Sequence, residues 1–187
     1  MALRPGRLRD ARGMTLIELS VVMCILGILL VIAVTTLLHA RTSADEAAAM
    51  SVLRTINTAQ FAYTTGCGRG GYAPSLTVLA VKPPNLKQGY LSDDLGAYDM
   101  PLRSGYRFNV RPGFDGNAGF PDCNGTPTLT TYYAVAIPVV AGQKGSRAFA
   151  TNQKGAIYQL NGATPAGAVR SSFAACPVTQ LVSLDNS

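Results

Sequence analysis

The feature that most constrains this chain of 187 residues is a long apolar run near its N-terminus. From Met14 to Leu38 most side chains are apolar, and Glu18 is the only charged one. As a helix, this run would span about 37 Å at roughly 1.5 Å per residue, which is enough to cross a bilayer. The run therefore predicts a helix that spans a membrane.

Basic residues precede this run and set its expected orientation. Arg4, Arg7, Arg9 and Arg12 lie ahead of it, and positive flanks stay on the cytoplasmic side. We therefore expect the N-terminus in the cytoplasm and most of the chain outside. A secretory signal peptide is the competing interpretation, but its apolar core is shorter, and no convincing cleavage site follows this run.

The helical pattern continues past the apolar run. No glycine or proline occurs between Leu29 and Thr65, so we predict one helix from Met14 to about Thr65, ended by Gly66 and Gly68. Its second half, residues 39–65, is amphipathic. The residues of its apolar stripe recur at helical spacing and are Ala48, Val52, Ile56, Ala59 and Tyr63.

The rest of the chain is rich in glycine and proline and carries short alternating segments. Residues 66–105 predict a loop with a helical turn near 75–80, and 112–128 predict a second loop. Strands are expected at 106–110, 129–140, 147–151 and 156–159, with a weaker one near 177–184. The predicted fold class is α+β, in which a long helix packs on a small antiparallel sheet of about four strands.

Charge and composition argue against several function classes. The leader, residues 1–13, contributes three of the six formal net positive charges, so without it a strongly basic surface for nucleic acid is not expected. His39 is the single histidine and is interpreted as a residue at the membrane interface. No catalytic set can be assembled around it, so we expect neither an enzyme nor a cofactor.

The residues around the start of the run form a recognisable motif. Arg12-Gly13-Met14-Thr15-Leu16-Ile17-Glu18-Leu19 resembles the signal of type IV prepilins and of type II secretion pseudopilins. The family pattern is a basic leader, a glycine, a hydrophobic residue and a glutamate as the fifth residue after the cut. All four parts are present, and the predicted helix and sheet fit the family's lollipop shape.

The resemblance implies a maturation pathway. A membrane aspartyl peptidase would cut after Gly13 and methylate the new amino group of Met14. The mature chain would consist of residues 14–38 in the membrane and later the filament core, 39–65 as the amphipathic half of the helix, and 66–187 as the head. It would be held by lipid in the bacterial inner membrane, and a platform driven by a cytoplasmic ATPase would assemble it with other pilins into an extracellular or periplasmic filament.

A physical argument that does not depend on the family also assigns a role to Glu18. An ionisable residue within an apolar helix is costly and is usually kept for a partner. We expect that partner to be the Met14 amine of a neighbouring subunit, an attraction of roughly 4 kcal/mol before desolvation at about 4 Å and an effective dielectric of 20. The alternative is a carboxylate that extends to the lipid headgroups.

The cysteines leave several pairings open. Cys67–Cys123 is weakly preferred because it would join the end of the helix to the sheet edge, while Cys123–Cys176 and Cys67–Cys176 stay open. Cys24 lies in the apolar run and is interpreted as a small hydrophobic residue. No CxxC and no Cys/His cluster occurs, so no metal site is expected.

Alternatives also remain for the function. Within the family, a type IV pilin is preferred over a pseudopilin because the tail lacks the carboxylates of a calcium loop. An alternative from another class of function is a minor pilin that captures DNA in a competence system. Its DNA-binding surface would be a basic strip formed by Arg103, Arg107 and Arg111. The pair Tyr132 and Tyr133 is interpreted as sheet packing, with an adhesive patch as the alternative, and Gly27 as a point of helix melting or of close packing.

Overall fold

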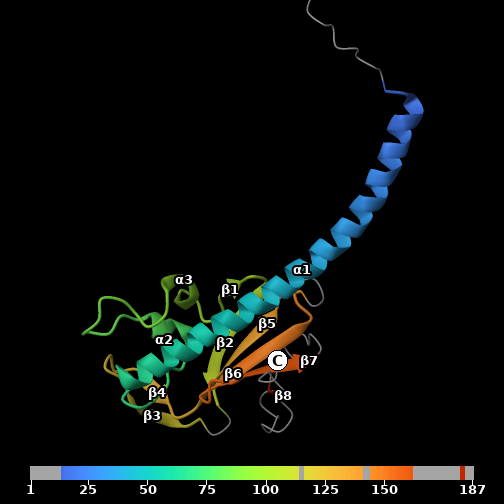
Figure 1. The fold of residues 1–187 in the computed structure, drawn as a ribbon. Helices are drawn as coiled ribbons and strands as arrows, with labels where there is room; N and C mark the ends of the chain where they lie inside the picture. Colours follow the sequence, from blue (N-terminus) through green and yellow to red (C-terminus); the bar gives the residue numbers. More distant parts are fainter. Residues whose placement is uncertain (1–13, 114–115, 141–143, 162–181, 184–187) are drawn as a thin grey trace, which may run out of the picture. The chain divides into compact units, whose positions relative to one another are not determined.

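A computed structural model describes residues 14–113, 116–140, 144–161 and 182–183 (Figure 1). The chain divides into two compact units between Ala40 and Arg41. The first unit contains the apolar half of the long helix, and the second contains the amphipathic half and the head. Cys176 lies outside the described residues, as does most of the weaker strand expected near the C-terminus.

The long helix α1 runs from Leu16 to Thr65 and confirms the predicted single helix of 50 residues. It begins two residues later than predicted, because Thr15 occupies the position before its first turn. The Thr15 hydroxyl accepts a hydrogen bond of 3.3 Å from the backbone N–H of Glu18. This is the geometry of an N-cap, which satisfies one of the free N–H groups at a helix start.

The second half of α1 is buried along one face, as its periodicity predicted. Four of the five residues of the predicted stripe are buried. The fifth, Ala48, is half-buried, and its neighbour Ala49 is fully buried instead. The helix ends where the backbone N–H of Gly68 bonds the Tyr63 carbonyl at 2.7 Å. The buried residues of α1 are Glu46, Ala49, Val52, Leu53, Ile56, Ala59, Gln60 and Tyr63.

An antiparallel sheet of six strands forms the centre of the head, in the order β1-β2-β5-β6-β7-β8. Its strands are β1 (Leu102–Arg103), β2 (Tyr106–Pro112), β5 (Tyr132–Pro138), β6 (Arg147–Asn152), β7 (Ile157–Asn161) and β8 (Val182–Ser183). The four predicted strands correspond to β2, β5, β6 and β7. The sheet has two strands more than the predicted four: β1, with two residues, carries too little pattern to be recognised, and β8 lies within the weaker strand expected near 177–184.

The prediction of a single strand at 129–140 was wrong in one respect. Leu129 ends a strand of one sheet, and Tyr132 begins a strand of another sheet. Residues Pro127–Leu129 form β4, which pairs with β3 (Ala118–Pro121) in a separate sheet of two strands. The chain then passes Thr130 and Thr131 and enters β5. The segment predicted as a loop at 112–128 therefore contains a hairpin.

Two short helices lie in the segment after α1 (Figure 1). The predicted turn is α2 (Leu76–Ala80), capped by the Ser75 side chain, which accepts from the Val78 N–H. The helix α3 (Asp93–Gly96) was not predicted, because four residues with two aspartates and a glycine have no apolar period.

The core of the head lies between the second half of α1 and one face of the sheet (Figure 1). Strand residues alternate between the two faces, so β2 places Tyr106, Phe108 and Val110 in this core. Phe149 of β6 joins them, and Leu76 and Leu79 of α2 close one side. The head therefore has an apolar centre built around α1.

Polar side chains of α1 also bind separate parts of the head. The fully buried amide of Gln60 donates to the Ala73 carbonyl at 3.0 Å and accepts from the Ala73 N–H at 2.9 Å. The Asn57 amide donates to the Thr151 hydroxyl at 2.7 Å and accepts from the Tyr132 hydroxyl at 2.8 Å. These bonds fix the register of α1 against the loop and the sheet.

Candidate processing and assembly site

The predicted site residues lie at the very start of α1. Met14 and Thr15 precede the helix, and Glu18 lies in its first turn. The Met14 side chain is 63% exposed and that of Leu16 is 86% exposed. Gly13, on the other side of the expected cut, lies outside the described residues.

A carboxylate in the first turn of a helix interacts favourably with the positive end of the helix dipole. Thr15 and Glu18 also have the spacing of a capping box, in which the residue at the cap and the glutamate three positions later support the first turn. This signal was present in the sequence and was overlooked there. Of the capping box only the bond from the Glu18 N–H to the Thr15 hydroxyl is found among the described residues, so the local role of Glu18 is its interaction with the helix dipole.

Glu18 makes no ion pair among the residues that the structure describes. The two ion pairs found there join Arg103 to Asp94 and Arg147 to Glu46. The Glu18 side chain is exposed and is surrounded by apolar residues of its own helix. Its charge is therefore available to a group from outside the chain.

The first unit presents apolar side chains on every side. An 18-residue stretch of α1 has a mean hydropathy of 3.0, and none of it is buried by the residues that the structure describes. Ile25, Leu29 and Ile32, which belong to this run, are each more than half exposed. A continuous apolar surface of this kind needs lipid or other protein to cover it.

Comparison with known proteins bears on this segment. Residues 8–34 match the family model described as the prokaryotic N-terminal methylation motif. The chain carries the type IV pilin and pseudopilin signal. No curated protein and no solved structure matches the chain.

The pilin signal covers the expected cleavage site, Glu18 and most of the apolar run. Within it, a Cβ added at Gly27 would meet nothing within 4 Å in the single chain. A need for glycine at this position would therefore come from the helix backbone or from neighbouring subunits. Cys24 is a free, exposed cysteine on the same helix, and His39 is exposed near its midpoint.

The preferred disulfide, Cys67–Cys123, is present, with a Cα–Cα distance of 4.9 Å. It joins the loop after α1 to the turn that connects β3 and β4. A backbone hydrogen bond of 3.0 Å from the Cys123 N–H to the Cys67 carbonyl supports the same junction. The Tyr63 hydroxyl donates to Asp122 next to it, at 2.8 Å.

The surroundings of the three arginines argue against the alternative in which they form a basic strip that binds DNA. Arg103 is paired with Asp94, which leaves Arg107 and Arg111 as exposed residues of β2. Tyr106 and Phe108, which flank Arg107, are fully buried in the core. They are unavailable for stacking on bases, which is the usual partner of a basic groove in proteins that bind single strands.

Tyr132 and Tyr133 were both predicted to pack in the sheet, and the structure confirms this for Tyr132. Tyr132 is 2% exposed, and its ring stands 4.8 Å from that of Tyr72, centroid to centroid. Burial raises the pKa of its hydroxyl well above the usual value. Tyr132 therefore belongs to the core and not to an adhesive surface, while Tyr133 is half-buried.

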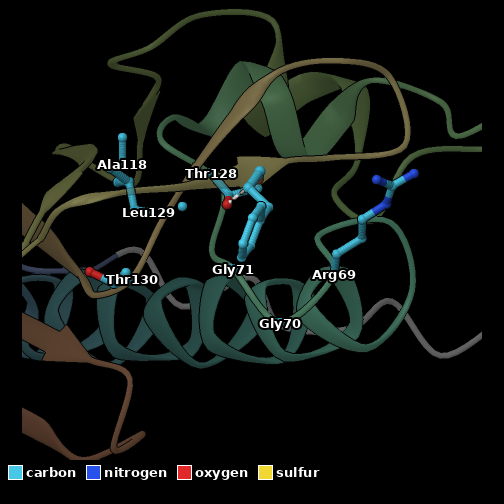
Figure 2. Close-up of a pocket in the computed structure, with 9 residues that line it drawn as sticks. Arg69, Gly70, Gly71, Ala118, Thr128, Leu129 and Thr130 are labelled. Carbon is cyan, nitrogen blue, oxygen red and sulfur yellow. Dashed lines mark hydrogen bonds between the residues drawn. The ribbon is translucent and has the colours of Figure 1, made fainter.

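A pocket of about 380 Å³ opens between the loop after α1 and the β3–β4 hairpin (Figure 2). Arg69 is its only charged lining residue, and it lies in the left-handed region with φ of 50°. The Thr128 hydroxyl donates to the Phe120 carbonyl at 2.7 Å, so it is already engaged. No histidine, cysteine or carboxylate lines the pocket, so its lining offers no general base.

Proposed function

We propose that this chain is a structural subunit of a type IV pilus-like filament, processed between Gly13 and Met14. The observation that carries the proposal is the position of the pilin signal. It leads directly into a helix whose first half is apolar on every side and whose second half is the spine of a folded head. Such a subunit can be stored in a membrane and then packed into a filament.

The two halves of α1 would have different partners. Residues 41–65 already have theirs, because their apolar face is buried against the head. The apolar run that begins at Met14 is exposed within the part of the chain that the structure describes, so lipid covers it before assembly and neighbouring helices cover it afterwards. The exchange of lipid for protein contacts yields little hydrophobic free energy, so packing and polar contacts must favour the filament.

Glu18 would supply one such polar contact. In the filament its carboxylate would pair with the methylated amine of Met14 in a neighbouring subunit. A charged pair in apolar surroundings is sensitive to position, since a shifted helix leaves both charges buried and unpaired. The pair therefore favours one axial register.

The proposal is tested by locating the chain in cells. Filaments are sheared from the surface and probed with antibodies against the head, in a wild-type strain and in one that lacks the prepilin peptidase. We expect the chain in the wild-type filaments, and only the longer form in the mutant membranes. A chain that stays in the membrane at the same length in both strains would contradict the proposal.

Both pilins and secretion pseudopilins carry this signal, so a further measurement is needed to separate them. Protein secretion is measured in a strain that lacks the gene for this chain, beside the location of the processed chain in the wild type. Retention of the processed chain in the periplasm, together with loss of protein secretion when its gene is deleted, would assign it to a type II secretion system. A surface filament with normal secretion would assign it to a pilus. DNA capture would appear as salt-dependent binding of DNA by the purified chain.

A further inference from the structure

One short motif lies outside the pilin signal, at the turn between β3 and β4. Asn124-Gly125-Thr126 has the form Asn-x-Ser/Thr with a residue other than proline in the middle, and it is the only such triplet in the sequence. This triplet is the acceptor sequence for N-linked glycosylation. Asp122 stands two positions before the asparagine, at the start of the same turn.

The structure presents this triplet on a defined turn. The Asp122 carboxylate accepts hydrogen bonds from the backbone N–H groups of Asn124, at 2.8 Å, and Thr126, at 2.7 Å. Gly125 has φ of +84°, a left-handed conformation that glycine adopts without strain. The turn is therefore held by the Asp122 carboxylate and backbone N–H groups, and the side chains of the triplet are not needed to hold it.

The acceptor side chain is exposed. Asn124 is an exposed residue, and within the described ranges its side-chain amide makes no hydrogen bond. A Cβ built at the neighbouring Gly125 would meet nothing within 4 Å, so the space around the turn is open. A bulky group on Asn124 would extend from the head without displacing core residues.

The disulfide beside the turn gives independent evidence that this part of the chain lies outside the cytoplasm. Cys123 directly precedes Asn124 and is bonded to Cys67. Disulfides form and persist outside the reducing cytoplasm, and the Asn-x-Ser/Thr triplet acts as an acceptor in secreted proteins. The acceptor triplet thus lies in a part of the chain that reaches the appropriate compartment.

We propose that Asn124 is the attachment site of an N-linked saccharide; this inference rests on the proposed function, which places the head outside the cytoplasm. A membrane oligosaccharyltransferase would supply the saccharide from a polyprenyl-pyrophosphate carrier. The Asn124 amide nitrogen bonds the anomeric carbon, and the bond from that carbon to the pyrophosphate oxygen breaks. The lipid pyrophosphate leaves with the electron pair, and one amide proton passes to a base, so no oxidant or reductant is required.

The site has a structural consequence for a filament subunit. The saccharide would stand at the end of the β3–β4 hairpin, beside the disulfide and the last turn of α1. It would be bulky and polar, so it would increase the solubility of this end of the head. That end must then face solvent or a wide gap in any filament that contains the modified subunit.

The test uses the full chain, purified from native membranes and filaments, reduced and digested with trypsin. The peptide from Phe108 to Lys144 contains Asn124, and mass spectrometry with fragmentation reports any added saccharide and its position. We expect a saccharide on Asn124 that is lost in Asn124→Gln and Thr126→Val. It should be retained in Thr126→Ser, which keeps the hydroxyl, and in Asn117→Gln, an exposed asparagine of the same hairpin without the motif.

Three results would overturn the inference: a bare Asn124 in wild-type protein, a saccharide that survives Thr126→Val, or one attached elsewhere on this peptide. The N-terminal peptide from the same digest reports the proposed processing separately. A methylated Met14 together with a bare Asn124 would overturn the glycosylation alone. An unmethylated peptide that begins at Gly13, where trypsin cuts an unprocessed chain after Arg12, would instead count against the proposed function.

Discussion

The Nε atom of Arg147 lies 3.1 Å from the Oε2 atom of Glu46, and this ion pair joins α1 to the start of β6. The other carboxylate oxygen of Glu46 accepts from the backbone N–H and the hydroxyl of Ser146, at 2.9 and 3.0 Å. Glu46 is only 7% exposed, so its charge is compensated by these groups and little by water. Arg147 is partly exposed, and it also donates to Gln159 at 3.1 Å.

Replacing Glu46 by alanine should destabilise the head by about 2 kcal/mol, because the two part-buried hydrogen bonds to Ser146 and the ion pair to Arg147 are lost together. The exposed side of Arg147 limits the loss, since water can solvate the unpaired guanidinium. Urea denaturation of the full chain in detergent, followed by circular dichroism, measures the change. Asp45→Ala, at the neighbouring position, is the control and should change stability much less.

Removing the disulfide through Cys67→Ala should also destabilise the head. The bond closes a loop between residues 56 positions apart, and the chain-entropy relation gives about 4 kcal/mol for a loop of this length. The measurement is the denaturation midpoint with and without a reductant, which should have no effect on the variant. Cys24→Ala, which removes a free cysteine, should leave the midpoint unchanged, and an equal loss in both variants would contradict the assignment.

Alkaline pH should unfold the head through three buried tyrosines. Burial raises the pKa of Tyr63, Tyr106 and Tyr132 above the usual 10.0. The folded head thus holds these protons more tightly than the unfolded chain does. This stabilisation is complete below pH 10.0 and is lost as the pH rises above it.

The denaturation midpoint should therefore fall as the pH is raised through about 10 to 11. Tyr132→Phe should make this fall shallower, because phenylalanine does not ionise. Tyr98→Phe changes a tyrosine that is 72% exposed and should leave the pH profile as it is. Identical profiles for Tyr132→Phe and the wild type would show that Tyr132 does not take part.

Glu18→Ala should be cut after Gly13 and inserted normally but should enter few filaments. The incoming Met14 amine would then be buried without its partner, a loss of several kcal/mol for a buried charge. Glu18→Gln keeps the shape and polarity but cannot neutralise the amine, so it should assemble poorly as well. The measurement is the ratio of chain in sheared filaments to chain in membranes.

A control is needed because Glu18 also supports the first turn of its own helix. Thr15→Val removes the cap hydroxyl that accepts from the Glu18 N–H while leaving the carboxylate in place. If only the helix start matters, Thr15→Val and Glu18→Gln should reduce assembly equally. If the carboxylate pairs with a neighbour, Thr15→Val should assemble far better than either Glu18 variant.

Much of the fold could be predicted because periodic patterns are long in this chain. The absence of glycine and proline over more than thirty residues predicted α1, and Gly66 marked its end correctly. The β3–β4 hairpin could not be predicted, because its strands contain glycine and proline and, among the described residues, pair with each other and with Tyr72. Thr130 and Thr131 have good strand propensity, so the break between β4 and β5 is a tertiary effect.

The candidate site was predicted from local residues, and the bonds that hold the head together were not. Gln60 stands at helical spacing from Ile56 and Tyr63, and Glu46 does not stand three or four residues from any residue of the predicted stripe. Whether either side chain is buried depends on a partner far along the chain. Gln60 meets Ala73 and Glu46 meets Ser146, and no short-range pattern indicates either contact. The Cys67–Cys123 pairing was similarly open, because three pairings were consistent with the sequence.

The mass of the mature N-terminus tests the central claim most directly. Removal of residues 1–13 from the chain of 187 leaves 174 residues that begin with Met14. Mass spectrometry of the protein extracted from membranes should find this chain with a methylated Met14 amine, and Gly13→Val should block the cut. An intact leader in the wild-type protein, or a cut after the apolar run near Leu38, would contradict the account.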